Sequence, residues 1–160
     1  MKNELKDFLA AGLKHYKQAS YVMTEFFRNT QDELQGILSK RKDWGSAFKP
    51  KETIKVRSTK YWDEYPLINA FIAGTIEGEA AKIGIAINWF QSESEYPFYE
   101  VWLNEGPDNI YKNIGAYKKR GRFELSEKNL GLKMYPDPND FNMERDFTIL
   151  IDEFVRTVSN

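Results

Sequence analysis

Hydrophobic side chains near the N-terminus recur at intervals of three and four residues, which is the period of one helix face. The pattern runs from residue 3 to residue 40 and predicts helix over this whole range. Its apolar stripe consists of Leu5, Phe8, Leu9, Gly12, Leu13, Tyr16, Ala19, Met23, Phe26, Phe27, Thr30, Leu34, Ile37 and Leu38.

The length of this stripe decides between one helix and two. A single rod would be about 55 Å long, whereas a domain of this size has a radius of gyration of about 15 Å. The segment Thr30-Gln31-Asp32-Glu33 fits a capping box, in which the threonine caps an amide and the glutamate reaches back. We therefore expect a break near Asn29 and a pair of helices. If the helix instead runs unbroken, we expect its free end to bind a partner chain.

The middle of the chain alternates apolar and polar residues with a period of two, which is typical of β-strands. The connections near residues 77–80 and 91–97 have the composition of hairpin turns, and residues 105–121 have that of a loop. We expect strands at residues 69–77, 81–90, 98–104, 123–125 and 132–135.

A helical period returns after the proline-rich segment 136–140 and continues to about Val158. The order of elements predicts a single α+β domain over residues 1–160, with a helix pair (or one long helix), a central antiparallel sheet of about five strands, and a C-terminal helix. Crossover helices of a parallel sheet would have no room between residues 69 and 104.

The two expected hairpins suggest a register and therefore two sheet faces. With turns centred on Glu79 and Ser94, Gly74 lies opposite Gly84 and Asn88 lies opposite Glu100. One face is apolar and belongs under the helices, while the second combines small residues with aromatic ones. We interpret the second face as a shallow binding trough, unless a helix of the same chain covers it. Its candidate binding residues are Gly74, Gly84, Ala86, Asn88, Glu100 and Trp102.

Charge is distributed unevenly although the formal net charge is only -1. Residues 40–60 carry eight basic and two acidic side chains, and residues 61–108 carry one basic and nine acidic. The segment 111–123 interleaves cations with aromatic rings, which suits phosphates and unpaired bases unless both basic segments are merely solvated loops. The alternative function is therefore a single-stranded nucleic-acid-binding protein using segments 40–60 and 111–123. Its candidate residues are Tyr117, Lys118, Lys119, Arg120 and Arg122.

Side-chain chemistry narrows the catalytic possibilities. The chain has no cysteine and one histidine, His15, which excludes thiol catalysis and the usual zinc ligand sets. It also lacks a glycine-rich phosphate loop. We expect no cofactor and no metal site. A metal-dependent hydrolase is a third hypothesis, because carboxylates can hold magnesium or act as acid and base. The carboxylates concerned are Glu77 with Glu79, Asp63 with Glu64, and Glu100.

The sequence also predicts a cellular location and a class of function. No segment approaches the roughly 18 apolar residues of a membrane span, and the N-terminus lacks the apolar run of a secretory signal. We therefore predict a cytoplasmic location and no membrane contact. The leading prediction is a non-enzymatic intracellular protein-interaction module that binds a protein partner, a second copy of itself included. It rests on the overlong helical stripe, the apolar second sheet face and the lack of a catalytic constellation.

Overall fold

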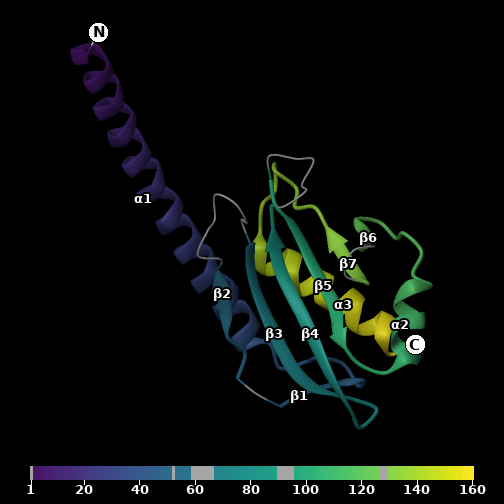
Figure 1. The fold of residues 1–160 in the computed structure, drawn as a ribbon. Helices are drawn as coiled ribbons and strands as arrows, with labels where there is room; N and C mark the ends of the chain where they lie inside the picture. The colour runs from purple at the N-terminus through teal and green to yellow at the C-terminus, as the bar shows by residue number, and fades with distance from the viewer. Residues whose placement is uncertain (1, 52, 59–66, 90–95, 127–129) are drawn as a thin grey trace.

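The computed structural model describes residues 2–51, 53–58, 67–89, 96–126 and 130–160 (Figure 1). Over these residues the chain forms three helices and one antiparallel sheet of seven strands, which confirms the α+β class. The sheet is larger than the predicted five strands, because two short strands precede the central hairpin. The helices are α1 Lys2–Lys40, α2 Asp108–Gly115 and α3 Met143–Val158. The strands are β1 Phe48–Pro50, β2 Val56–Ser58, β3 Leu67–Ile76, β4 Glu79–Asn88, β5 Phe98–Glu105, β6 Phe123–Ser126 and β7 Gly131–Met134.

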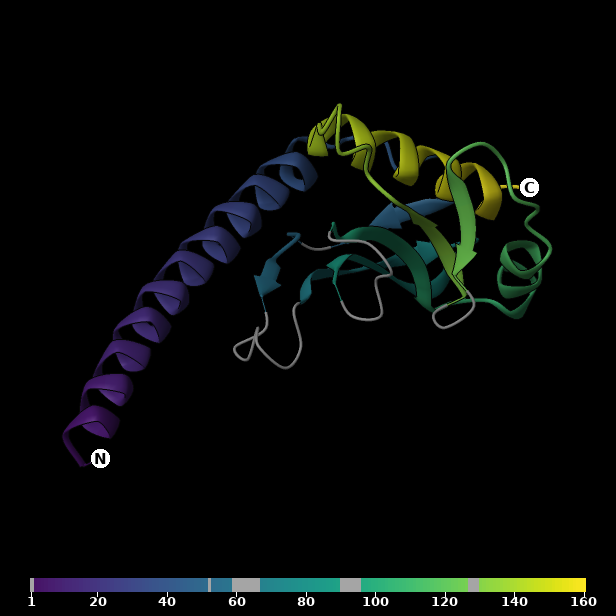
Figure 2. The same ribbon diagram turned by 90° about the horizontal axis from the view of Figure 1, so that it is seen from above.

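Long strands occupy the centre of the sheet and short strands its edges. The order is β1-β3-β4-β5-β7-β6, and β2 pairs with the other half of the edge of β3. The segments before β3 and after α2 therefore lie at opposite edges of the sheet. Helix α3 crosses one face, which becomes the core, and Figure 2 shows the C-terminal end of α1 beside it.

Helix α1 is unbroken over its 39 residues, so the expected break near Asn29 is wrong. At 1.5 Å per residue the helix is about 58 Å long. The predicted capping threonine lies inside the helix, where the Thr30 hydroxyl donates to the carbonyl of Phe26 at 2.8 Å. Threonine can satisfy its hydroxyl in this way in a continuous helix, so the capping motif does not require a helix start.

The C-terminal half of α1 belongs to the domain. Phe27 is 4% exposed, and Leu34 and Leu38 are fully buried. Polar side chains from the same half close the edge of β2. The Gln35 amide donates to the carbonyl of Ile54 at 2.9 Å and accepts from the amide of Val56 at 2.8 Å. An open sheet edge invites pairing with another chain, so this contact also protects β2.

Helix α3 fills the core face. Asn142 accepts from the amide of Arg145 at 2.9 Å and caps its N-terminus. The Phe147 ring stacks on Tyr99 of β5, with ring centroids 4.4 Å apart. Arg41, just beyond α1, pairs with Asp152 at 2.5 Å. The predicted apolar face of α3 is confirmed as buried, and it comprises Met143, Phe147, Leu150, Ile151, Phe154 and Val158.

The expected loop at residues 105–121 contains helix α2, so this part of the prediction is wrong. Pro107 occupies the N-cap, and Ile110 and Ile114, four residues apart, are buried. A proline at the start and an apolar pair at helical spacing are sufficient for one amphipathic helix of this length.

The β3–β4 register also differs from the prediction. The turn consists of Glu77 and Gly78 alone, both with positive φ, as a tight two-residue hairpin requires. Gly84 therefore lies opposite Phe71 instead of Gly74. The shift covers an odd number of residues, so it exchanges the faces of β3. In β4 and β5 the predicted faces are confirmed, although Asn88 pairs with Phe98 and Glu100 pairs with Ala86.

Candidate functional site

The N-terminal half of α1 projects beyond the sheet and α3, as Figure 2 shows. We call residues 4–26 of this helix the arm. Several of its large apolar side chains face solvent: Phe8 is 74% exposed, Leu13 60% and Tyr16 64%. Exposed apolar side chains gathered along one element are a common mark of an interaction surface. The others on the arm are Leu9, Tyr21, Val22 and Phe26.

Most of the arm's apolar residues continue the helix face that the domain buries. Phe27, Leu34 and Leu38 are buried at spacings of four and seven, and the same spacings lead back through Met23 and Tyr16. One continuous apolar stripe is therefore exposed on the arm and buried in the C-terminal half of α1.

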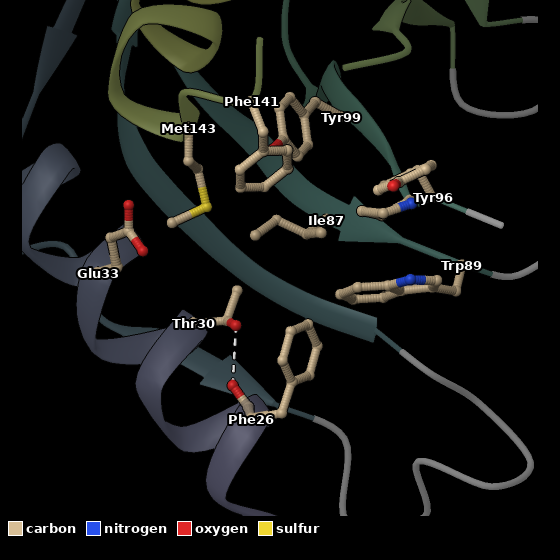
Figure 3. A pocket seen from close by; sticks show the side chains of 10 residues that line it. Phe26, Thr30, Glu33, Ile87, Trp89, Tyr96, Tyr99, Phe141 and Met143 are labelled. Atoms are coloured by element: carbon tan, nitrogen blue, oxygen red, sulfur yellow. Dashed lines mark hydrogen bonds between the residues drawn. The ribbon is translucent and has the colours of Figure 1, made fainter. Parts of the chain in front are cut away.

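A pocket of about 430 Å³ lies at the base of the arm, between α1, the adjoining ends of β4 and β5, and the segment before α3 (Figure 3). We call it the aromatic pocket. The Phe26 and Trp89 rings meet edge to face at 5.7 Å on one side. Pockets of this size with mostly apolar walls are typical of binding sites for small groups or for anchoring side chains. Its lining residues are Phe26, Thr30, Glu33, Ile87, Trp89, Tyr96, Pro97, Tyr99, Phe141 and Met143.

Two polar groups distinguish the lining of the aromatic pocket. The buried hydroxyl of Tyr99 has no hydrogen-bond partner among the described residues. Burial raises the pKa of this hydroxyl above its ordinary value, the carboxylates of Asp146 and Glu33 raise it further, and Arg122 opposes the shift. The phenol is therefore a neutral donor at pH 7. Glu33 adds a carboxylate on the exposed surface of α1.

Sequence reasoning missed the aromatic pocket because its walls come from distant segments. The sequence pattern assigns Phe26 and Tyr99 to separate buried faces and Phe141 to the start of the C-terminal helix, whereas α3 begins at Met143. The available signal was aromatic density next to turns, which does not show that three segments converge. The pocket depends on the unbroken α1, because a break near Asn29 would have redirected Phe26.

The predicted trough is filled by the protein's own side chains where the glycines lie. A side chain at Gly84 would meet the indole of Trp102 at 2.2 Å, so this ring lies over the glycine. Phe71 contacts the same indole edge to face at 5.7 Å. The structure thus brings five predicted binding residues onto one face, namely Gly84, Ala86, Asn88, Glu100 and Trp102. Gly74 lies on the opposite face, beneath the Phe48 ring, so its placement in this set is wrong.

Glu100 is 2% exposed and accepts a short hydrogen bond from the hydroxyl of Ser126. Its place on the second face, between Ala86 and Lys133 of the neighbouring strands, follows from the observed register. A carboxylate held in this way stabilises the joint between β5 and the β6–β7 hairpin.

The two basic segments do not form one groove along the sheet, because they flank opposite edges. Lys119 pairs with Glu124 at 2.7 Å, and Arg122 donates to the carbonyl of Tyr135 at 2.9 Å. Tyr117, Lys118 and Arg120 line an open hollow beside the end of α3 that also contains acidic Glu153. Lys60 lies outside the described residues.

The carboxylates proposed for metal chemistry are dispersed where the structure describes them. Glu77 lies in the β3–β4 turn and Glu79 begins β4, and the Glu77 carboxylate accepts from the side chain of Asn109 at 3.3 Å. Within the described ranges, no group of three or more histidine, aspartate and glutamate side chains is placed to hold a metal ion. His15 is exposed on the arm, and Asp63 and Glu64 lie outside the described residues.

The arm and the aromatic pocket at its base define an α+β domain with a projecting amphipathic helix. Neither a protein-family model, nor a curated protein, nor a solved structure matches the chain. In the part of the chain described here, none of the helices is both long and apolar enough to span a membrane.

Proposed function

We propose that this chain is a protein-interaction module that binds its partner through the apolar stripe of the arm. The observation that carries the proposal is the arm itself, an unbroken helix whose large apolar side chains are more than half exposed at Phe8, Leu13 and Tyr16. Helices in proteins gain most of their stability by packing an amphipathic face against other elements. A free helix of this length therefore favours a partner.

The aromatic pocket supports the same proposal. Phe26 belongs both to the arm and to the pocket, so the stripe leads into a concave apolar surface. A helix laid along the arm could anchor a side chain there, as helix-in-groove recognition requires. The apolar side chains would supply the affinity, and the Tyr99 and Glu33 groups would orient the anchor.

The proposal is tested by placing charge on the stripe. In the double variant Phe8→Glu and Leu13→Glu, two buried carboxylates would oppose any apolar partner. We expect arm-dependent binding to fall at least about tenfold, which corresponds to 1.4 kcal/mol or more. The readouts are sedimentation equilibrium of the purified chain and affinity capture from a lysate of its source cells.

A matched control adds the same charge to the opposite helix face. Ala10→Glu with Gln18→Glu also introduces two glutamates at exposed arm positions, away from the stripe. This variant should bind as the unmodified chain does, and both variants should unfold at the same temperature. A chain that stays monomeric and captures no protein through its stripe would refute the proposed function.

A further inference from the structure

The spacing of large and small residues along the arm distinguishes between partners. Leu9, Tyr16 and Met23 recur every seven residues on the stripe, and Gly12 and Ala19 recur every seven residues between them. These are the two central rows of a coiled-coil heptad, one row large and the other containing small residues.

Two copies of the arm could pack these rows in parallel or antiparallel. Only the antiparallel pair avoids layers that alternate between two large and two small side chains. A parallel pair would place Tyr16 beside Tyr16 and Gly12 beside Gly12. An antiparallel pair places Leu9 and Tyr16 beside small residues, because reversal sets one row against the other. Tyr16 then lies beside the partner's Gly12, and Leu9 lies beside the partner's Ala19. Uniform layers of this kind approach the even packing density of protein interiors.

The same antiparallel register uses the apolar residues at the margins of the stripe. Phe8 meets the partner's Val22, and Leu13 meets the partner's Leu13. Both Phe8 and Val22 are among the most exposed apolar side chains of the domain. With roughly 100 Å² of exposed surface on each of six such side chains, a pair would bury on the order of 1,200 Å². That area reaches the lower end of the range for specific interfaces.

Charge and length allow this arrangement. Residues 1–27, which overlap in this register, carry four basic and three acidic side chains, so each arm is close to neutral. The overlap ends where each domain body begins, so each arm is covered along its whole length of about 35 Å.

We propose that the partner of the arm is a second copy of this chain, joined as an antiparallel helix pair with Tyr16 beside the partner's Gly12. This inference rests on the proposed function and names its partner. In this arrangement the N-terminal turn of each copy lies level with Met23 and Phe26 of the other, at the mouth of the aromatic pocket. The pocket then receives the end of the neighbouring arm.

Single-cysteine variants test the arrangement, because the chain contains no other thiol. A disulfide requires Cα atoms within about 7 Å. Under mild oxidation Leu13→Cys should form a linked dimer. Leu9→Cys alone and Ala19→Cys alone should remain unlinked, and a mixture of the two should form a dimer containing one of each. Ala10→Cys, on the opposite face, is the control and should not link.

Each other outcome overturns the inference in a recognisable way. Linkage of Ala19→Cys to itself would indicate a parallel pair. No linkage, together with stripe-dependent capture of a different protein by a monomeric chain, would overturn the second copy and leave the proposed function standing. Stripe-dependent binding to vesicles of anionic phospholipid by a chain that captures no protein would overturn both.

Discussion

Replacing Leu38 by alanine is expected to lower the free energy of unfolding by about 2–5 kcal/mol, the range for removing a buried leucine side chain. Leu38 lies near the C-terminal end of α1, which packs on the sheet, and its side chain is fully buried. The substitution leaves a cavity that a packed core closes only in part. Urea unfolding measures the change, at a protein concentration low enough to keep the chain monomeric.

Leu13→Ala is the matched control, because it is the same substitution on the same stripe. Leu13 lies on the arm and is 60% exposed, so its loss should change the stability of the monomer by less than about 0.5 kcal/mol. Equal losses for the two variants would contradict the division of α1 into a buried half and a free arm.

Replacing Gly131 by alanine should destabilise the domain by about 1–3 kcal/mol or more, because it overpacks the second sheet face. A Cβ there would lie 2.2 Å from the carbonyl oxygen of Val101 and 2.5 Å from the Cβ of Trp102. The oxygen belongs to the neighbouring strand and cannot move without disturbing the pairing of β5 with β7. Thermal unfolding would report the loss as a lower Tm.

Gly36→Ala is expected to change the stability of the domain in the opposite direction. A Cβ at this helical position meets no atom within 4 Å, and alanine favours helix over glycine by about 0.5–1 kcal/mol. We therefore expect Gly36→Ala to raise the Tm slightly. If Gly131→Ala were no less stable than Gly36→Ala, β5 and β7 would not be paired as described.

Helix faces and fold class followed directly from periodicity. The stripe from Phe27 to Leu38 and the face of α3 from Met143 to Val158 are buried as predicted. Their physical basis is the strong coupling between apolar spacing and burial in a helix. The same stripe shows no difference between its buried and exposed parts, since exposure depends on where the sheet ends.

The errors arose where a local motif has two physical outcomes. Thr30 can cap a helix or bond back within one, and only the packing of Gln31 and Gln35 on β2 decides for the latter. Glu77 adopts a left-handed conformation that is uncommon for its residue type, so the hairpin is tighter than its composition suggested. The resulting shift moved Gly74 to the core face.

The candidate site depends on long-range packing, which explains why only its arm was foreseen. The sequence predicted that an unbroken α1 would have a free end that binds a partner chain. The unbroken helix is observed, and the partner stays a prediction. The aromatic pocket was not foreseen, because Phe26, Trp89 and Phe141 converge only after α1 and α3 have packed on the sheet. Three separated aromatic residues have no sequence spacing that would reveal this.

Hydrogen exchange of the arm amides at several protein concentrations tests the central claim most directly. In a dilute, monomeric chain the amides of residues 4–22 should exchange rapidly, because this part of α1 is largely exposed. At high concentration they should become protected, while amides of β3, β4 and β5 keep the same protection throughout. Arm amides whose exchange does not depend on concentration would contradict the claim that another copy covers the stripe.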